Sequence, residues 1–372
     1  MYPTLSTAMR EKLADRAAAL GFARSGFVAA GRSENADHLD RWLAEGMQGE
    51  MGWMETHAHI RRDASLIEPW ARSLMVLAVP YALPAGSDPV ISHYAQGNDY
   101  HDAIRLRLRA LGAYAEAEFG LRTRPAVDSA PLWERDLAAR AGLGWAGKSG
   151  MVLHPALGSA FFLASLVLDA ELADAAARQP DRCGSCTRCI SACPTGAITA
   201  PGTVDARRCI AYLTIELRGP IPRALRPAIG HRLFGCDLCQ TVCPWNTRWE
   251  RSQSWPELAP RPEVAATTAR EVLAMSQEAF STRFRGSPIK RTKRAGLARN
   301  AAVVLGNSGD ATNLALLVET LQSHDEPLVR GHAAWALARL AGAEAAAALR
   351  RAADREEDLY VRDEIAAAEQ GS

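Results

Sequence analysis

The sequence predicts a chain of three parts: an α/β or α+β domain, a cysteine-rich insert and a C-terminal helical repeat. Three observations lead to this division. Helical patterns alternate with short apolar runs in the first half of the chain, all eight cysteines lie between Cys183 and Cys243, and a helical motif recurs near the carboxyl end at intervals of 31 and 32 residues. With 48% hydrophobic and 23% charged residues in 372, the composition is that of a globular chain and excludes disordered and fibrous classes.

Residues 1–179 are expected to form the α/β or α+β domain, around a mixed sheet. Helical periodicity covers Thr7–Leu20, Asp37–Gly46 and Tyr100–Phe119. Short apolar runs are typical of strands, and they occur at Ser73–Tyr81, Thr123–Val127, Gly150–His154 and Ala160–Leu168.

The cysteines of residues 180–250 follow the spacing of bacterial ferredoxins. The run Cys183-x-x-Cys186-x-x-Cys189-x-x-x-Cys193-Pro194 is one in which three thiolates hold one iron–sulfur cluster and the fourth reaches a second cluster. A second motif, Cys236-x-x-Cys239-x-x-x-Cys243-Pro244, has Leu233 where its first cysteine would stand. Cys209 is the natural replacement, so each cluster has four ligands.

We therefore predict two [4Fe-4S] clusters. The first is held by Cys183, Cys186, Cys189 and Cys243, and the second by Cys193, Cys209, Cys236 and Cys239. Two Cys₄ zinc sites are the alternative, but zinc does not require the repeated CxxxCP spacing. Structural disulfides are rare in a reducing compartment.

The tail is expected to be a HEAT-like repeat over residues 290–372, after a linker over residues 251–289. Leu297-x-Arg299-x-x-Ala302, Leu328-x-Arg330-x-x-Ala333 and Tyr360-x-Arg362-x-x-Ile365 share one pattern. A repeat of this kind indicates stacked helix pairs with an extended binding face.

A local basic run lies where the repeat begins. The formal net charge of the chain is only +1, yet no acidic residue occurs between Ala279 and Gly309. The basic residues of this stretch are Arg283, Arg285, Lys290, Arg291, Lys293, Arg294 and Arg299. Clustered Lys and Arg bind phosphate backbones by releasing counterions. A solvated charged face is the alternative.

The sequence also predicts a cytoplasmic protein. Its longest mainly apolar stretch, near Ala160–Leu168, is much shorter than a membrane span. The amino terminus lacks the basic, apolar and small-residue order of a signal peptide.

Several motifs together resemble those of one known family. They are Met51–Met54 with Arg61, Gly97–His101 (GNDYH), Val127–Asp136 (VDSAPLWERD), Ala141–Ser149 (AGLGWAGKS), both cysteine motifs including Cys236–Asn246 (CDLCQTVCPWN), and the helical tail. On these residues, which extend along nearly the whole chain, the sequence resembles the epoxyqueuosine reductases, cobalamin-dependent iron–sulfur enzymes that complete queuosine synthesis in tRNA.

The resemblance implies a fold and an activity. Residues 1–179 would bind cobalamin, the ferredoxin-like insert would reduce it with electrons from an external donor, and an epoxide on the wobble nucleoside would be deoxygenated. The implied partner is a tRNA with a GUN anticodon that carries epoxyqueuosine, and the implied protein is a monomer without membrane attachment.

The resemblance also implies site residues. Asp128 would be the proton donor, and its burial against the corrin would raise its pKa. Further cobalamin contacts would come from Arg61, His93, Lys148, Ser149, Leu153 and Ala211. The basic run, and not the resemblance, predicts tRNA contacts from Lys290, Arg291, Lys293 and Arg294. Asp99-x-His101 is similar to a cobalt-binding DxHxxG signature, but Ile104 replaces the glycine. We therefore expect no cobalt–His bond, and instead Asn98 or Asp99 as the helix cap.

Two other functions remain open from the sequence. A reductive dehalogenase also joins cobalamin to two clusters, but such enzymes usually carry a twin-Arg leader and a Tyr donor, and this chain has neither the leader nor a Tyr in the motif of residues 127–136. A simple ferredoxin-type electron-transfer module would contain the clusters and no corrinoid.

Overall fold

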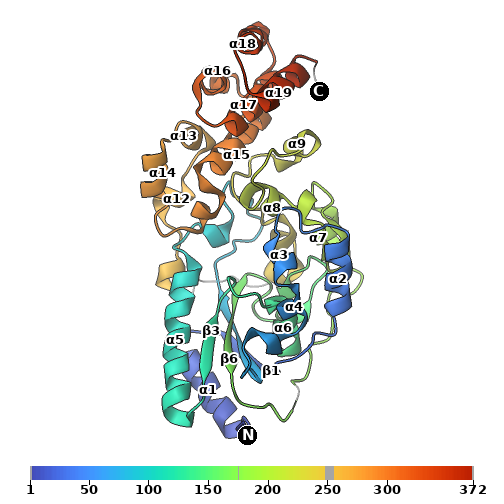
Figure 1. The fold of residues 1–372 in the computed structure, drawn as a ribbon, viewed down its shortest axis with the longest axis vertical. Coiled ribbons are helices and arrows are strands. Elements are labelled where there is room, and N and C mark those ends of the chain that lie inside the picture. Colours follow the sequence, from blue (N-terminus) through green and yellow to red (C-terminus); the bar gives the residue numbers. More distant parts are fainter. Residues whose placement is uncertain (1, 175, 248–254, 371–372) are drawn as a thin grey trace. The chain divides into compact units, whose positions relative to one another are not determined.

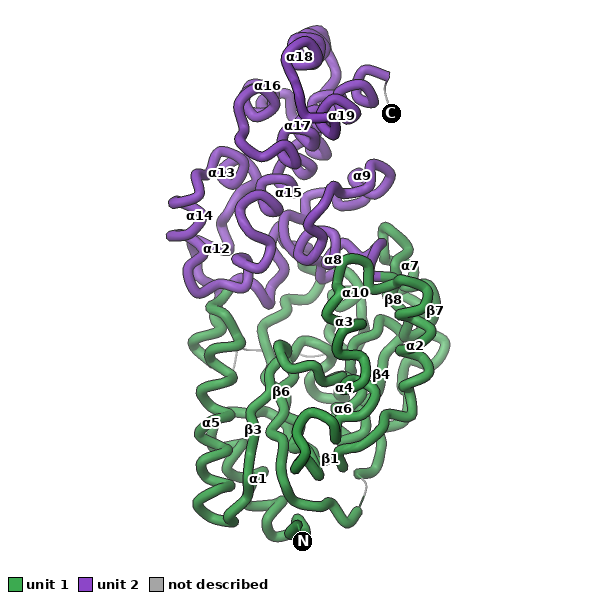
Figure 2. Tube along the Cα trace, in the orientation of Figure 1, with its two compact units in different colours: residues 1–87, 97–205, 238–259 green, residues 88–96, 206–237, 260–372 purple. Residues whose placement is uncertain are grey.

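The computed structural model describes residues 2–174, 176–247 and 255–370 (Figure 1). The chain divides into two compact units (Figure 2). Unit 1 comprises residues 1–87, 97–205 and 238–259, and unit 2 comprises residues 88–96, 206–237 and 260–372. Each unit is therefore built from segments that are distant in the sequence.

Unit 1 contains a four-stranded sheet in the order β1-β2-β6-β3. Its strands are β1 (Arg24–Ala29), β2 (Ser73–Pro80), β6 (Phe161–Leu168) and β3 (Thr123–Ala126). All three neighbouring pairs are antiparallel, so the expectation of a mixed sheet is wrong. Alternating helices and apolar strands do not encode strand direction, which depends on how the connections cross the sheet.

Helices cover both faces of this sheet. Side chains of α1 (Thr7–Ala19) and α5 (Tyr100–Phe119) join the core on one face, together with Met75 and Leu77 of β2. Leu74 of β2 points to the opposite face. The core on that face also contains Leu137 and Ala138 of α6 (Glu134–Arg140) and Ile67. Because successive strand residues face opposite sides, β2 is buried throughout.

The predicted helices of unit 1 agree with the structure. Helix α5 begins after Asp99, whose side chain accepts a hydrogen bond from the N–H of His101, and ends at Gly120 with φ +66°. This confirms Asp99 as the cap. Helix α2 (Ala36–Ala44) is shorter than expected. The predicted strand Gly150–His154 is only β5 (Val152–Leu153), which pairs with β4 (Trp145–Ala146) in a separate hairpin.

The cysteine motifs form short turns and helices. In unit 1 these are α7 (Arg188–Ser191), α10 (Leu238–Thr241) and α11 (Pro244–Thr247), with a small hairpin of β7 (Ile198–Ala200) and β8 (Thr203–Val204). In unit 2, Cys209 directly precedes α8 (Ile210–Ile215), and α9 (Arg226–Ile229) follows.

The helical repeat forms most of unit 2. Its helices are α15 (Lys293–Ser308), α16 (Leu314–Ser323), α17 (Pro327–Leu340), α18 (Ala343–Ala353) and α19 (Leu359–Glu369). The three copies of the repeated motif lie on α15, α17 and α19, and these helices pack against one another in succession.

Part of the expected linker is helical. Residues 251–254 lie outside the described residues, but α12 (Pro262–Ala265), α13 (Ala269–Leu273) and α14 (Gln277–Arg283) follow. Val272 and Phe280 are buried, and α13 packs against α15. These helices extend the repeat toward its amino-terminal end.

Candidate functional site

Asp128 lies in the loop that connects β3 to α6. Its φ is +43°, a left-handed conformation that costs a residue with a Cβ roughly 1–2 kcal/mol. Its backbone N–H donates a hydrogen bond of 2.9 Å to Oε1 of Glu134, the first residue of α6. The helix terminus therefore helps to hold the loop in a conformation that few residues adopt.

The first turn of α5 supplies two partners to the Asp128 carboxylate. The Tyr100 hydroxyl donates to Oδ2 at 2.6 Å, and His101 Nε2 lies 3.2 Å from the same oxygen. His101 Nδ1 lies 2.7 Å from Oδ1 of Asp99. The Tyr100 ring stacks on Phe162 with centroids 4.2 Å apart. Both His101 nitrogens therefore contact carboxylates.

The pKa values of His101 and Glu134, near Asp128, are both raised. Burial lowers the pKa of His101, but hydrogen bonds to Asp128 and Asp99 more than offset it and raise the pKa to about 9. Burial and the adjacent Asp128 charge raise the pKa of Glu134 to about 8. At neutral pH these two residues hold protons.

In this structure the pKa of Asp128 lies below its usual value, whereas the raised pKa depends on burial against the corrin and stays a prediction. Desolvation by surrounding atoms raises this pKa, but hydrogen bonds from His101 and Tyr100 outweigh it and lower the pKa below its usual value. The side chain is also 59% exposed. The sequence could not show these partners, because Tyr100 and His101 are about 28 residues away along the chain.

The other residues expected at the corrin lie in both units. In unit 1, Arg61 is buried and donates to the carbonyl of Trp53 at 3.0 Å, and Leu153 is buried in β5, whereas Lys148 and Ser149 are half-buried. In unit 2, His93 Nδ1 lies 2.8 Å from Oδ2 of Asp237, and Ala211 is a half-buried residue of α8.

Four cysteines of unit 1 make up the first predicted ligand set. Burial raises the pKa of Cys189, and the nearby Cys243 and Cys183 raise it further. Burial also raises the pKa of Cys243, with added contributions from Cys183 and Cys186. Interactions of this kind act at short range. Cys183 and Cys186 therefore lie close enough to Cys189 or Cys243 to affect the pKa of those thiols.

The members of the second predicted set are also half-buried thiols. Cys193 accepts a hydrogen bond of 3.2 Å from the backbone N–H of Ala197. Burial raises its pKa, but hydrogen bonds from Thr195 and from backbone N–H groups outweigh this and lower it. Among the described residues, no group of three or more His, Cys, Asp or Glu side chains surrounds the position of a single metal ion.

Gln240, between Cys239 and Cys243, and Asn246, shortly after Cys243, have a structural role that the sequence did not predict. The amide of Asn246 donates to Ser159 Oγ at 2.9 Å and to the Gln240 carbonyl at 2.7 Å, and its Oδ1 accepts from the N–H of Ser159. The side chain of Gln240 accepts from the hydroxyl of Tyr81 at 3.1 Å. The sequence CPWN at residues 243–246 was the signal from which the role of Asn246 could have been predicted.

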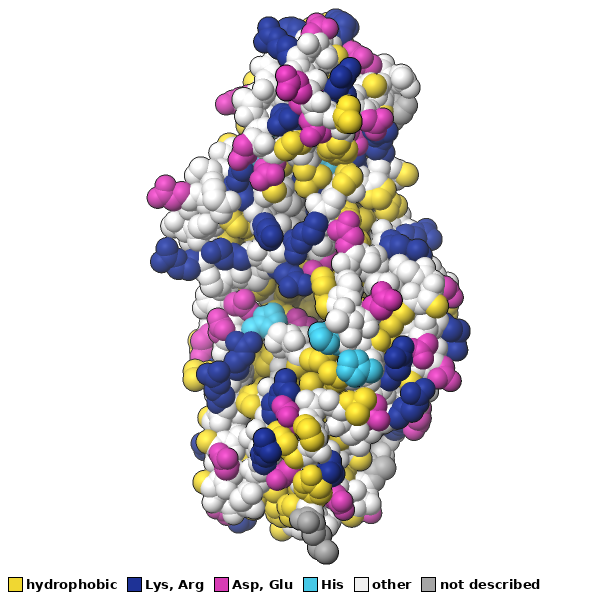
Figure 3. All heavy atoms as spheres, viewed as in Figure 1, with side chains coloured by type: hydrophobic (Ala, Val, Ile, Leu, Met, Phe, Trp, Pro, Cys, Tyr) yellow, Lys and Arg dark blue, Asp and Glu magenta, His cyan; other side chains and the backbone are white. Residues whose placement is uncertain are grey.

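The basic run of unit 2 contains exposed lysines and arginines that form ion pairs. Figure 3 shows Lys and Arg side chains over the helices from α12 to α15. Lys290 and Lys293 are exposed. Arg291 pairs with Glu216 at 2.9 Å, and Arg294 pairs with Asp325 at 2.5 Å.

Arg299 does not belong to the basic surface. It is fully buried in α15 and donates to the carbonyl oxygens of Leu213, Leu217 and Gly219 at 2.7–2.9 Å. Its expected role in phosphate binding is therefore wrong. Sequence position alone does not distinguish a surface arginine from one that satisfies buried carbonyls.

Relatives with assigned functions cover most of this chain. The epoxyqueuosine reductase of Escherichia coli strain K12 is 41% identical over 334 residues, 86% of this chain and 86% of that protein. The epoxyqueuosine reductase of Shigella dysenteriae serotype 1 is 42% identical over 334 residues, which also cover 86% of this chain and 86% of that protein. The chain belongs to the epoxyqueuosine reductase family.

Family models place three of the predicted parts. "Epoxyqueuosine reductase QueG, DUF1730" matches residues 61–129, "4Fe-4S double cluster binding domain" matches residues 182–246, and "HEAT repeats" matches residues 290–369. The prediction of two [4Fe-4S] clusters in this family member is confirmed, and so is the HEAT-like tail.

Solved structures of epoxyqueuosine reductases have the same fold. One from Bacillus subtilis, with its catalytic aspartate loop swung out of the active site, has a TM-score of 0.90 and 31% identity, and the match covers 98% of this chain and 99% of that one. Another, with a tRNA-Tyr epoxyqueuosine-modified tRNA stem loop, has a TM-score of 0.88 and 31% identity over 98% of each chain.

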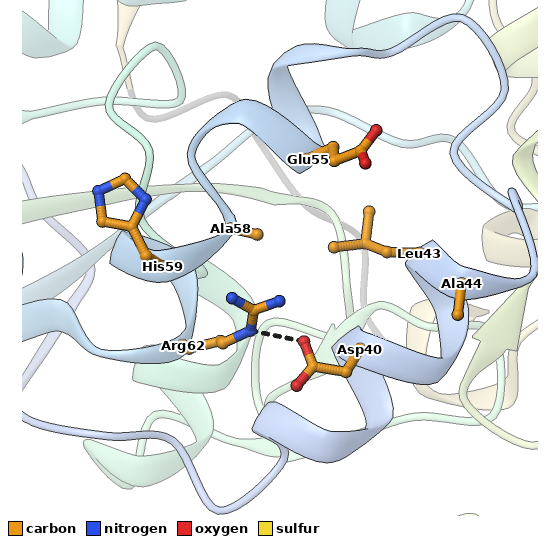
Figure 4. A pocket seen from close by; sticks show the side chains of 7 residues that line it. All are labelled: Asp40, Leu43, Ala44, Glu55, Ala58, His59 and Arg62. Carbon is orange, nitrogen blue, oxygen red and sulfur yellow. Dashed lines mark hydrogen bonds and ion pairs between the residues drawn. The ribbon is translucent and has the colours of Figure 1, made fainter.

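One pocket of this family member is lined by three helices of unit 1. A pocket of about 340 Å³ opens between α2, α3 (Trp53–Thr56) and α4 (Ala58–Arg62) (Figure 4), and it contains none of the predicted site residues. Its lining residues are Asp40, Leu43, Ala44, Glu55, Ala58, His59 and Arg62. None of the helices in the described ranges has the length and apolar composition that crossing a bilayer requires.

Proposed function

We propose that this protein reduces epoxyqueuosine to queuosine at the wobble position of tRNA, with electrons that pass through its two [4Fe-4S] clusters to cobalamin. Family membership and the relative solved with an epoxyqueuosine-modified stem loop support this reaction. The observation that carries the proposal is the Asp128 carboxylate, which is held by Tyr100 and His101.

The residues around Asp128 are suited to cobalamin. Tyr81, Phe162, Tyr100 and His101 form a continuous series of ring contacts with centroids 4.1–5.0 Å apart, and flat aromatic faces suit a planar macrocycle. Arg61, His93, Lys148, Ser149, Leu153 and Ala211 are its further proposed contacts. When bound, cobalamin supplies low-valent cobalt as the immediate reductant of the epoxide.

Asp128 and His101 manage the proton that the reaction consumes. Loss of the epoxide oxygen as water takes up protons as well as electrons. His101 holds a proton at neutral pH and contacts Oδ2 of Asp128, which in turn delivers it to the departing oxygen. Asp128 is the catalytic residue, and His101 is its proton source.

The eight cysteines provide two clusters with four thiolates each. Cys183, Cys186, Cys189 and Cys243 hold the first cluster, and Cys193, Cys209, Cys236 and Cys239 hold the second. Electrons would reach these clusters from an external donor. Clusters ligated in the ferredoxin manner carry single electrons, so each turnover requires two transfers.

The substrate tRNA is held through its phosphates. Lys290 and Lys293 are exposed cations of the basic run, Arg291 is exposed and paired with Glu216, and Arg294 is paired with Asp325. Phosphate contacts position a nucleic acid without reading its bases. The modified nucleoside of a tRNA with a GUN anticodon would therefore be recognised as an unstacked base beside the cobalamin. The protein acts as a cytoplasmic monomer.

One experiment tests the reaction directly. The protein is reconstituted anaerobically with iron, sulfide and cobalamin, and supplied with a chemical reductant and epoxyqueuosine-containing tRNA. Nucleoside analysis should then detect queuosine. Unchanged epoxyqueuosine in the presence of both loaded clusters and bound corrinoid would overturn the proposal. A preparation that loads clusters and binds no corrinoid would support the electron-transfer alternative.

A further inference from the structure

The β4–β5 hairpin contacts residues 183–186, here called the first cysteine loop, at two places within unit 1. The indole Nε1–H of Trp145 donates a hydrogen bond to Sγ of Cys183, with the two atoms 3.4 Å apart. At the tip of the hairpin, Lys148 Nζ donates to the carbonyls of Gly184 and Cys186 at 2.5 and 3.1 Å. A cation and an indole N–H thus both act on the loop that carries Cys183.

The hairpin holds the Trp145 ring in a defined orientation. Trp145 is only 3% exposed, and its ring meets that of Trp245 edge to face, with centroids 5.1 Å apart. A Cβ on Gly144 would lie 2.2 Å from the Leu153 carbonyl oxygen, so the two strands approach closely. The turn is closed by a 2.8 Å hydrogen bond from the N–H of Gly147 to the carbonyl of Met151.

We propose that Trp145 and Lys148 raise the reduction potential of the first cluster, which rests on the proposed role of Cys183 as one of its ligands. Reduction adds negative charge to the cluster and its sulfurs. A hydrogen bond to a ligand sulfur and a nearby ammonium stabilise that charge more than they stabilise the oxidised state. Hydrogen bonds to the sulfurs are among the factors that set cluster potentials.

Two substitutions remove these contributions separately. Trp145→Phe keeps an aromatic ring against Trp245 and removes the N–H donor. Lys148→Met keeps most of the side-chain length and removes the charge. Each substitution is expected to lower the equilibrium constant for one-electron reduction of the first cluster about tenfold. This corresponds to a reduction potential that is lower by ~59 mV. The matched control is Trp70→Phe, because the buried Nε1 of Trp70 has no hydrogen-bond partner among the described residues.

The test is an anaerobic redox titration of the cluster-loaded enzyme, followed by electron paramagnetic resonance. We expect lower first-cluster potentials in Trp145→Phe and Lys148→Met, with wild-type iron content, and the wild-type potential in Trp70→Phe. Wild-type potentials in both hairpin variants would overturn the inference. Cys183→Ser tests the ligand assignment itself. If it leaves both clusters intact, the assignment fails; if it damages one cluster while the hairpin variants titrate like wild type, only the tuning role fails.

A measurement on the unmodified protein does not depend on whether Trp145→Phe folds. Exchange into D₂O replaces the indole N–H by N–D, which should shift an iron–thiolate stretching band in the resonance Raman spectrum. Trp70→Phe should keep that shift. Its absence from the wild-type spectrum would overturn the inference in the same way as unchanged potentials.

Discussion

The backbone N–H of Asp128 donates a 2.9 Å hydrogen bond to Oε1 of Glu134, six residues further along the chain. This bond connects the residue with a φ of +43° to the beginning of α6. The Asp128 carboxylate is held separately, by Tyr100 and His101. The loop therefore has one attachment through its backbone and another through its side chain.

Removing the backbone attachment should slow the reaction. Glu134→Ala eliminates the acceptor, and we expect turnover to fall about tenfold, since a net hydrogen bond contributes roughly 0.5–1.5 kcal/mol. Glu134→Gln keeps a carbonyl acceptor and should remain within a few-fold of wild type. Single-turnover rates on modified tRNA measure both. Equal rates for Glu134→Ala and wild type would exclude the positioning role.

Asp128→Asn should retain cobalamin and both clusters and lose most activity. The amide is nearly isosteric with the carboxyl group but does not carry the proton to the departing oxygen, and general acid catalysis typically contributes roughly 10²–10⁴ in rate. Absorption spectra serve as the control for cofactor content. A rate within a few-fold of wild type would remove Asp128 from its proposed role.

The rate should depend on pH through His101. Its pKa is raised to about 9, so the proton is present below that pH and is lost as the pH rises through it. We expect the single-turnover rate to be level near neutrality and to fall above about pH 9. His101→Gln should lower the rate and abolish this decline. A wild-type profile that stays flat to pH 10 would contradict the assignment of the proton to His101.

Cys209→Ser should damage only the second cluster. The other four-thiolate set remains complete in this variant, so about four of eight irons per chain should be retained. Iron analysis and electron paramagnetic resonance give the count and identify the surviving cluster. Loss of both clusters would indicate a different partition of the ligands.

The exposed lysines should account for much of the salt dependence of tRNA binding. Lys290→Met with Lys293→Met should weaken binding and reduce the slope of log affinity against log salt by less than about one unit per lost contact. The control is Lys12→Met, since Lys12 is an exposed lysine of unit 1 paired with Glu118. An unaltered slope in the double variant would assign the run to a solvated surface.

The sequence alone was sufficient where the signal is local. The periodicity of Tyr100–Phe119, with a cap expected at Asn98 or Asp99, predicted α5 with its observed bounds. The spacing of the cysteines predicted two clusters, because ligand geometry depends on residues a few positions apart. Helical periodicity likewise predicted the repeat, since each repeat contacts mainly its neighbours.

Only the tertiary structure decided what depends on distant segments meeting. It made all sheet pairs antiparallel, buried Arg299 among backbone carbonyls, and placed Lys148 on the first cysteine loop. It also placed Tyr100 and His101 of α5 against the Asp128 carboxylate, where their hydrogen bonds lower its pKa. Proton affinity and burial are set by neighbours in space, and neighbours in space are not encoded by residue type or spacing alone.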